Sequence, residues 1–190
     1  MGEKPTVKAG DARTRLQSAA LALFKEHGYD AVTAAQIAAV AGVTERTFFR
    51  HFPDKREVVF QGEEVLRDAL TEAVADVPPG LPPLTALFRA FYAVVPLLEG
   101  NRQVSIPLAE VVAVTPALQE REAAKIGALG EALAAALEHR GTPQLHAALA
   151  ARTGLGAFVH AVGAWLPDPQ PPLGQRIAEA EAALREVLET

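Results

Sequence analysis

Residues 33–52 read TAAQIAAVAGVTERTFFRHF and predict two short helices joined by a tight turn. Thr33 and Gln36 have the spacing of a capping box, in which the Thr hydroxyl accepts the backbone N–H of the third helical residue and the Gln side chain returns to the cap. Gly42 supplies the positive φ that a turn between crossed helices usually needs. Thr44 is placed to cap the second helix. The stretch therefore has the pattern of a helix-turn-helix.

The second helix of this motif has two different sides. Phe48 and Phe52 are four residues apart and fall on the side that faces the core. Thr47, Arg50 and His51 share the outer side. A generic three-helix bundle explains the apolar periodicity but not this outer run of polar and cationic residues, so the pattern favours a helix that lies against a charged surface.

The stretch from about residue 11 to residue 60 resembles the DNA-binding domain of the tetracycline-repressor (TetR) family. Several fixed spacings carry the resemblance together: Phe24-Lys25-Glu26-His27-Gly28-Tyr29, Thr33, Ile37-Ala38, Ala41-Gly42-Val43, Thr47-Phe48-Phe49-Arg50-His51-Phe52 and Lys55. The family has an all-α architecture. Periodicity and caps along this chain likewise predict nine helices and no strand.

The helical pattern predicts three regions. Residues 1–10 lack periodicity and are interpreted as a flexible arm, and residues 11–57 form the helix-turn-helix domain. Residues 58–190 form a helical body, to which the family resemblance assigns ligand binding and dimerisation. Asp54 and Glu57 have the spacing of a second capping box, which predicts that a long linking helix starts at Asp54 and runs to about Val77.

The N-terminal and C-terminal parts of the chain differ in net charge. Residues 1–57 carry nine Lys and Arg against seven Asp and Glu, a net charge of +2. Residues 58–190 carry nine against sixteen, a net charge of −7. A positive head on an acidic body would orient the molecule towards a phosphate backbone.

Composition and motifs exclude several other classes. The chain has 190 residues and no cysteine, so it forms no disulfide and no thiolate metal site. No apolar run reaches about 18 residues and the N-terminus lacks the apolar core of a signal peptide, so we expect a soluble cytoplasmic protein with no membrane partner. Serine-nucleophile, phosphate-loop and zinc-protease motifs are absent. We therefore expect no catalytic residue, no cofactor and no metal.

The family resemblance implies which residues meet double-stranded DNA. It places Thr33, His51 and Lys55 on phosphates and makes Thr44, Glu45, Arg46, Thr47 and Arg50 available to base edges or flanking phosphates. Arg46 is the best candidate for reading a base, because a guanidinium can pair bidentately with guanine. Phe49 stands where the family commonly has tyrosine, so only a ring contact is expected there. Ala35 stands where a long polar side chain often reads a base.

Aromatic and β-branched residues are concentrated in the body. An ordinary helical core explains them as well as a cavity does, and the family resemblance favours a pocket for a small-molecule effector. The predicted lining is Phe88, Phe91, Tyr92, Val95, Arg102, Gln103, Ile106, Val111, Phe158, Val162 and Trp165.

The last two long helices are predicted to form a homodimer. Leu173, Ile177, Ala180, Leu184 and Val187 follow a 4-3-4-3 spacing, and Leu155, Phe158, Val159 and Val162 form a companion stripe. Paired across a two-fold axis, these residues would make a four-helix interface.

These features together predict a repressor that reads a palindromic operator as a homodimer and is released by a small apolar or amphipathic effector. A constitutive DNA-binding or architectural protein without an effector is the main alternative. A helical enzyme or carrier is a third, which the outward Arg50, His51 and Lys55 argue against.

Overall fold

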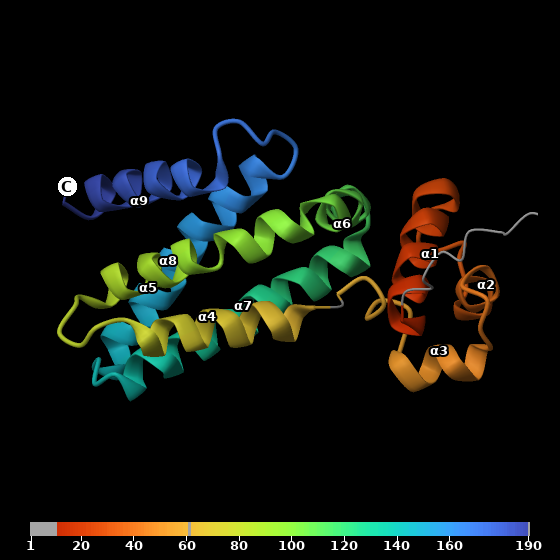
Figure 1. Cartoon of the computed structure of the whole chain (residues 1–190), viewed down its shortest axis with the longest axis horizontal. Coiled ribbons are helices and arrows are strands. Elements are labelled where there is room, and N and C mark those ends of the chain that lie inside the picture. The colour runs from red at the N-terminus through yellow and green to blue at the C-terminus, as the bar shows by residue number, and fades with distance from the viewer. Residues whose placement is uncertain (1–10, 61, 190) are drawn as a thin grey trace, which may run out of the picture. The chain divides into compact units, whose positions relative to one another are not determined.

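The computed structural model describes residues 11–60 and 62–189 (Figure 1). Within these ranges the chain forms nine α-helices and no strand, which confirms the predicted all-α class. The helices are α1 (Ala12–His27), α2 (Ala34–Val40), α3 (Glu45–His51), α4 (Glu63–Asp76), α5 (Pro83–Ala93), α6 (Val95–Ala113), α7 (Pro116–His139), α8 (Gln144–Trp165) and α9 (Leu173–Glu189). The arm predicted for residues 1–10 lies outside the described residues.

The helices divide into two compact units. Unit 1 contains α1 to α3, the turn that follows them and the segment Pro107–Arg121. Unit 2 contains Gly62–Ile106 and the chain from Glu122 onwards. This division differs from the boundary predicted at residue 57, because the end of α6 and the start of α7 group with the N-terminal helices.

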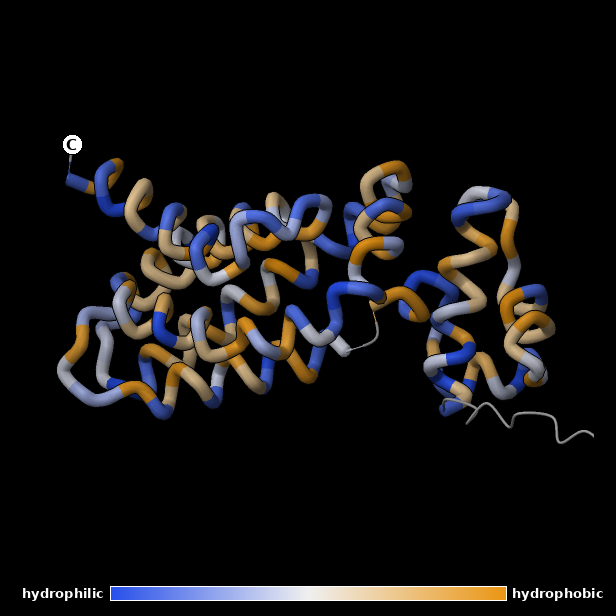
Figure 2. Tube along the Cα trace, turned by 45° about the horizontal axis from the view of Figure 1, so that its top comes forward, coloured by the Kyte–Doolittle hydropathy of each residue, from blue (hydrophilic) through white to orange (hydrophobic). Residues whose placement is uncertain are grey.

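A hydrophobic core explains this grouping in unit 1. Val111 and Leu118 are buried together with Leu16 of α1, Ile37 of α2 and Phe48 of α3. Hydrophobic positions recur along the helices at the spacing of a helical turn (Figure 2). The segment Pro107–Arg121 therefore completes a core that three short helices enclose only in part.

The predicted helix start at Asp54 is wrong. Residues 55–59 form turns, and α4 begins at Glu63 after Gly62, whose φ is 90°. The Oδ1 atom of Asp54 accepts the backbone N–H groups of Arg56 at 2.7 Å and Glu57 at 3.2 Å. The Asp54 side chain therefore closes a turn and does not cap a helix.

Helix α6 contains one glycine and two prolines. One helix ends at Ala93, and α6 then runs from Val95 through Gly100 to Ala113 with Pro107 inside it. Pro96 lies in the first turn of α6, where a backbone N–H has no intrahelical partner, so proline costs little there. A glycine inside a helix costs only about 1 kcal/mol, which the surrounding packing can offset.

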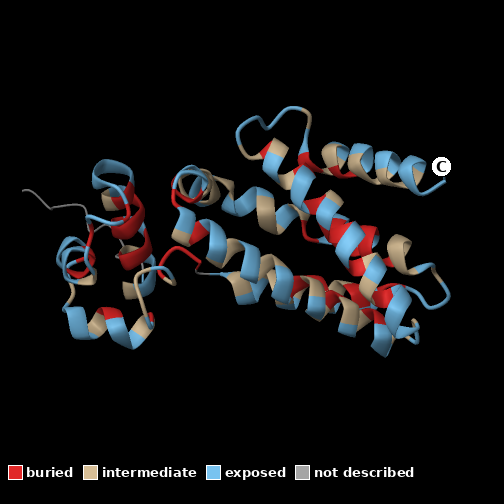
Figure 3. Cartoon of the chain, turned by 180° about the vertical axis from the view of Figure 1, so that it is seen from behind, coloured by how far each residue is buried: buried red, intermediate tan, exposed pale blue. Residues whose placement is uncertain are grey.

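Helix α8 supplies much of the core of unit 2. Its buried residues include Ala147, Ala151, Leu155 and Phe158, and its opposite side is exposed (Figure 3). The helix packs against α5 and α9. A Cβ atom at Gly154 would lie 3.2 Å from Leu84 Cδ1 and 3.3 Å from Leu87 Cδ1, so glycine permits the close approach of α8 and α5.

By length and composition alone, α8 also meets the criteria for a membrane-spanning helix. An 18-residue window within this 22-residue helix has a mean hydropathy of 1.2, which corrects the expectation that no apolar run reaches such a length. In the structure α8 is a core helix, because seven of its residues are buried in unit 2. Its apolar character is that of a central helix in a helical domain.

Candidate nucleic-acid interface

The capping box predicted at Thr33 is present. The Thr33 hydroxyl accepts the Gln36 backbone N–H at 3.2 Å, and the Gln36 side chain accepts the Thr33 N–H at 2.8 Å. Gly42 has φ 68°, the left-handed conformation predicted for the turn between α2 and α3. Thr44 caps α3 by accepting the Thr47 N–H at 3.2 Å. Local sequence signals therefore determine how the two helices start and how the chain turns between them.

Packing of its inner side fixes the orientation of α3. Phe48 is fully buried and its ring lies 5.3 Å from the ring of Phe49 and 5.7 Å from that of Phe52. Glu45, Arg46, Phe49 and Arg50 are exposed on the helix. Short and anchored, α3 thus presents two guanidinium groups, one carboxylate and one aromatic ring to its surroundings.

Two other predicted residues of α3 are only half-buried. The Thr47 hydroxyl lies 3.0 Å from the Thr44 hydroxyl, so it is engaged in the cap as well as being on the outer side. The Nε2 atom of His51 is enclosed and has no hydrogen-bond partner among the described residues. His51 therefore has an unused ring nitrogen at the C-terminal end of α3.

Lys55 does not point outward as the family resemblance implies. Its ammonium donates to the carbonyl oxygens of Tyr29 at 2.8 Å and Val32 at 3.0 Å. It also lies 4.1 Å from the centre of the Tyr29 ring. The two carbonyls and the ring hold this cation against the connection between α1 and α2, which corrects the expectation of an exposed phosphate contact.

One cation near α3 was not predicted from the sequence. The guanidinium of Arg13 on α1 lies 5.2 Å from the centre of the Phe52 ring, directly after the end of α3. Arg13 and Phe52 are far apart in sequence, so no local pattern signals this contact. Arg13 adds a third guanidinium to Arg46 and Arg50 as a candidate for contacting phosphate.

The effector pocket predicted in the body is occupied by its own side chains. Phe91 and Phe158 stack with ring centres 4.4 Å apart, and Phe88 packs edge-on against Phe91 at 5.5 Å. Phe88, Phe91, Phe158 and Trp165 are all buried in the core of unit 2. These contacts agree with an ordinary helical core, the alternative that the residues alone had left open.

The remaining members of the predicted pocket are dispersed. Val111 is buried in the core of unit 1, and Gln103 is exposed. Arg102 does meet Trp165, because its guanidinium lies 5.4 Å from the ring centre and donates to the Leu166 carbonyl at 2.6 Å. The others lie at the margin of the core: Tyr92 is 37% exposed, and Val95, Ile106 and Val162 are half-buried.

Tyr92 belongs to a polar cluster between α5 and α9. Its hydroxyl donates to Glu181 at 3.4 Å, and Arg185 donates to both Glu181 at 2.6 Å and Thr85 at 3.2 Å. Burial raises the pKa of the Tyr92 hydroxyl, and the neighbouring Glu181 carboxylate raises it further. Tyr92 is thus partnered within the protein instead of facing a cavity.

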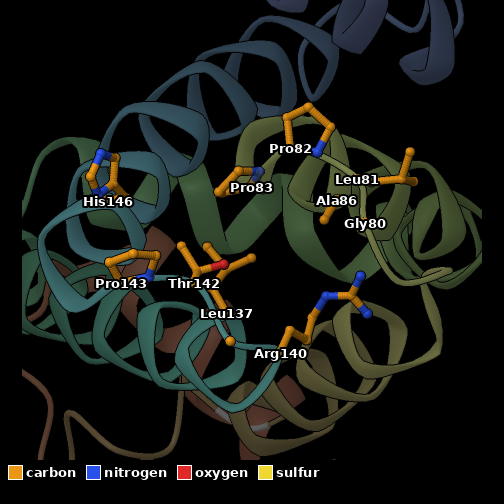
Figure 4. A pocket seen from close by; sticks show the side chains of 11 residues that line it. Gly80, Leu81, Pro82, Pro83, Ala86, Leu137, Arg140, Thr142, Pro143 and His146 are labelled. Carbon is orange, nitrogen blue, oxygen red and sulfur yellow. The ribbon is translucent and has the colours of Figure 1, made fainter.

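A cavity of about 400 Å³ lies elsewhere in unit 2 (Figure 4). Apolar residues and prolines dominate its wall, and Arg140, Thr142 and His146 add polar groups. The full lining is Gly80, Leu81, Pro82, Pro83, Ala86, Leu137, Arg140, Gly141, Thr142, Pro143 and His146. Arg140 also donates to the carbonyls of Val74 at 3.0 Å and Pro78 at 2.8 Å, so it ties the end of α4 to this cavity.

The predicted dimer residues divide between core and surface. Leu155, Phe158, Leu173 and Ile177 are buried within unit 2. Val162, Ala180 and Leu184 are partly buried against the same core. Val159 and Val187 are the exposed members, at 37% and 73%. Most of the predicted seam therefore packs inside one chain, because the heptad spacing marks the face that covers the chain's own core.

Comparison with known proteins finds a family match in the N-terminal part of the chain. Residues 16–61 match the family of bacterial regulatory proteins described as the tetR family. The HTH-type transcriptional regulator TcmR of Streptomyces glaucescens is 42% identical over 82 residues, which cover 43% of this chain and 36% of TcmR. The nucleoid occlusion factor SlmA of Escherichia coli is 39% identical over 70 residues, which cover 37% of this chain and 35% of SlmA. The matched region spans about a third of either relative.

The whole fold has counterparts among solved structures. A complex of SmeT with triclosan superimposes with a TM-score of 0.65 and 21% sequence identity, covering 93% of this chain and 90% of the SmeT chain. Residues 16–61 therefore match the helix-turn-helix domain of the tetR family, and the whole chain has the fold of SmeT.

Proposed function

We propose that this chain is a transcriptional repressor. It binds a palindromic operator in double-stranded DNA as a homodimer and leaves the operator when a small apolar or amphipathic effector binds. One observation carries the DNA-binding part: α3 is anchored through Phe48 and exposes Arg46 and Arg50. A helix held from its inner side with guanidinium groups outside is suited to the major groove, where arginine pairs with guanine.

Electrostatics supports the same assignment. Residues 1–57 have a net charge of +2 in a chain whose total is −5. Arg13 adds a guanidinium at the end of α3. Positive groups gathered at one helix contribute the sequence-independent part of DNA affinity, while exposed acidic residues elsewhere limit non-specific contacts.

The exposed side of α8 supports dimerisation with a second copy of this chain. Leu145, Leu149, Arg152, Gly156, Val159 and Gly163 are all exposed and follow a 4-3-4-3-4 spacing. Leu145 is 68% exposed and Leu149 55%, which is unusual for leucines on the central helix of a domain. The two glycines let another helix approach closely. This seam replaces the one predicted from the buried side of α8 and from α9.

An effector is supported by the cavity in unit 2 and by one relative. A volume of about 400 Å³ with a mostly apolar wall and a few polar groups is in the range of small-molecule sites. SmeT has been solved in complex with triclosan. The cavity beside Arg140 is therefore the proposed effector site, in place of the stacked aromatic residues.

A constitutive DNA-binding protein without an effector remains the second candidate. The specific observation in its favour is the likeness to SlmA, a nucleoid occlusion factor, over the same N-terminal region that matches TcmR. Both candidates require DNA and imply an intracellular location. They differ only in whether a small molecule releases the complex.

Selection from a pool of randomised DNA duplexes tests the proposal. The purified chain should enrich a palindromic sequence, and light scattering should give the mass of one dimer on the recovered duplex or of a small multiple of it. A library of apolar and amphipathic compounds is then screened for release of that duplex. Failure to enrich any sequence would overturn specific DNA binding. Enrichment without any releasing compound would favour the constitutive alternative.

A further inference from the structure

Lys55 lies where the chain leaves α3, and its side chain returns to the segment that enters α2. The ammonium donates to the Tyr29 carbonyl at 2.8 Å and to the Val32 carbonyl at 3.0 Å. It also sits 4.1 Å from the centre of the Tyr29 ring. The side chain is half-buried. Three independent contacts thus hold one cation at the connection between α1 and α2.

These contacts use most of the bonding capacity of the ammonium group. A lysine ammonium has three N–H donors, of which two are used on carbonyl oxygens here. The negative face of the Tyr29 ring attracts the same charge. A phosphate would therefore find one N–H donor of this ammonium unused, while the other two and the ring already hold the charge inside unit 1. Arg46 and Arg50, in contrast, are exposed on α3.

The segment that Lys55 holds determines where α2 begins. Val32 directly precedes Thr33, the residue that caps α2. Tyr29 is buried and its ring packs against Phe24 of α1 with ring centres 5.1 Å apart. Lys55 itself follows Phe52, the residue that ends α3, by three positions. One side chain therefore joins the end of α1, the start of α2 and the exit of α3.

We propose that Lys55 is a positioning residue for DNA binding: it fixes α2 and α3 relative to α1 and does not itself contact phosphate. This inference rests on the proposed DNA-binding function. It assigns Lys55 a role that differs from the one implied by the family pattern. Loss of the ammonium would let the α1–α2 connection move and would misplace the exposed residues of α3, which bind only when their geometry fits the groove.

Two matched substitutions separate positioning from phosphate binding. Lys55→Met removes the ammonium and keeps an apolar stem, and Arg50→Met makes the same change at an exposed cation. Affinity for a duplex recovered from the randomised pool is measured against salt concentration, well below the melting temperature of each variant. Amide hydrogen exchange is measured at residues 29–33 without DNA.

The positioning role predicts that Lys55→Met weakens DNA binding by about tenfold or more, the equivalent of one lost charged hydrogen bond. The slope of log affinity against log salt should stay unchanged, and exchange at residues 29–33 should become faster. Arg50→Met should reduce the slope by about 0.9 and leave that exchange unchanged.

Other results overturn the inference. A slope reduced by about 0.9 in Lys55→Met with unchanged exchange would assign Lys55 to a phosphate. Faster exchange with unchanged DNA affinity would make Lys55 a stabilising residue only. If the unsubstituted chain enriches no duplex, the proposed function fails, and the exchange measurement still shows whether the Lys55 contacts exist in solution.

Discussion

The guanidinium of Arg121 donates two hydrogen bonds to the carboxylate of Glu57, at 2.6 and 3.0 Å, across 64 positions of sequence. Both side chains are about a quarter exposed, at 24% and 26%. The Arg121 guanidinium also lies 5.0 Å from the centre of the Phe60 ring. This pair joins the first turns of α7 to the turns that follow α3, inside unit 1. It therefore helps to hold the segment Pro107–Arg121 in unit 1.

Replacing Arg121 by methionine should destabilise unit 1. The change leaves the half-buried Glu57 carboxylate without its two charged hydrogen bonds, which should cost about 1–3 kcal/mol. Amide exchange in α1 and α3 measures the opening of unit 1. Fluorescence of Trp165, the only tryptophan in the chain, monitors unit 2.

Arg67→Met is the matched control for Arg121→Met. Arg67 pairs with Asp68 on the surface, where the two side chains are 43% and 69% exposed, so its loss should cost less than about 1 kcal/mol. If both substitutions have the same effect on amide exchange in unit 1, the Glu57–Arg121 pair does not stabilise unit 1 more than a surface ion pair would.

The Glu57–Arg121 pair also explains one failure of the sequence analysis. Thr33 with Gln36 and Asp54 with Glu57 show the same local capping spacing, and only the first caps a helix. Gln36 returns to its own cap, whereas the Glu57 carboxylate is bound by Arg121. Signals within four residues predicted the helix-turn-helix correctly. At Asp54 the same local spacing did not predict a helix correctly, because Glu57 is bound by Arg121, which lies 64 residues away.

Local sequence patterns likewise failed to predict which partners the candidate site residues meet. Lys55 is a cation in a basic stretch of sequence, and only the carbonyls of Tyr29 and Val32 reveal that it faces inward. The spacing of Leu155 and Phe158 marks an apolar side of α8 but not whether that side meets α5 or a second chain. The cavity beside Arg140 is lined by two loop regions and the helix ends that flank them, so no periodic sequence pattern predicts it.

Arg46 and Arg50 should differ in their effects on DNA binding. Arg50→Ala should weaken binding to all sequences and reduce the log–log salt slope by about 0.9. Arg46→Ala should also relax sequence preference, with about 1–3 kcal/mol less discrimination against the wrong base, because a bidentate contact with guanine is proposed for Arg46. Salt titrations on the selected duplex and on a scrambled duplex measure both quantities. Unchanged slopes and preferences would remove these residues from the interface.

Gly154 should not tolerate a larger side chain. A Cβ atom there already approaches Leu84 and Leu87 at 3.2 and 3.3 Å, so Gly154→Val should cost about 1–3 kcal/mol through overpacking. Gly127→Ala on α7 is the control, because no heavy atom lies within 4 Å of a Cβ atom built there. The control should gain about 0.5–1 kcal/mol from helix propensity. Chemical denaturation followed by Trp165 fluorescence measures both variants.

Charge on the exposed side of α8 should prevent dimerisation. Leu149→Glu places a carboxylate in the middle of the proposed seam, where a two-fold axis would bring it near its own copy. Light scattering at micromolar concentration should then give a monomer, with unchanged helical content. Val187→Glu on α9 tests whether the seam extends to that exposed residue. A dimer that survives Leu149→Glu would place the interface elsewhere.

Asp54 should make the stability of unit 1 depend on pH. Burial raises the pKa of its carboxyl, but hydrogen bonds from the Arg56 side chain and from the backbone N–H groups of Arg56 and Glu57 outweigh burial and hold the pKa below the ordinary 3.8. The folded state therefore binds fewer protons than the unfolded state at pH values just below 3.8. The stabilisation is complete well above that pH and is lost as the pH falls through the folded pKa.

Asp54→Ala should cost about 0.5–1 kcal/mol at pH 7, in the lower part of the range for lost capping bonds because the carboxylate is 41% exposed. Hydrogen exchange in α1 and α3 measures the free energy of unfolding of unit 1. The difference in this free energy between Asp54→Ala and the unsubstituted chain should stay constant down to about pH 5 and shrink below it. Asp54→Asn is the control, because its amide oxygen keeps an acceptor for the backbone N–H groups and does not titrate. Its stability should therefore lack the step in acid. A difference that grows as the pH falls would mean that the folded state raises this pKa, and the turn at Asp54 would then need another account.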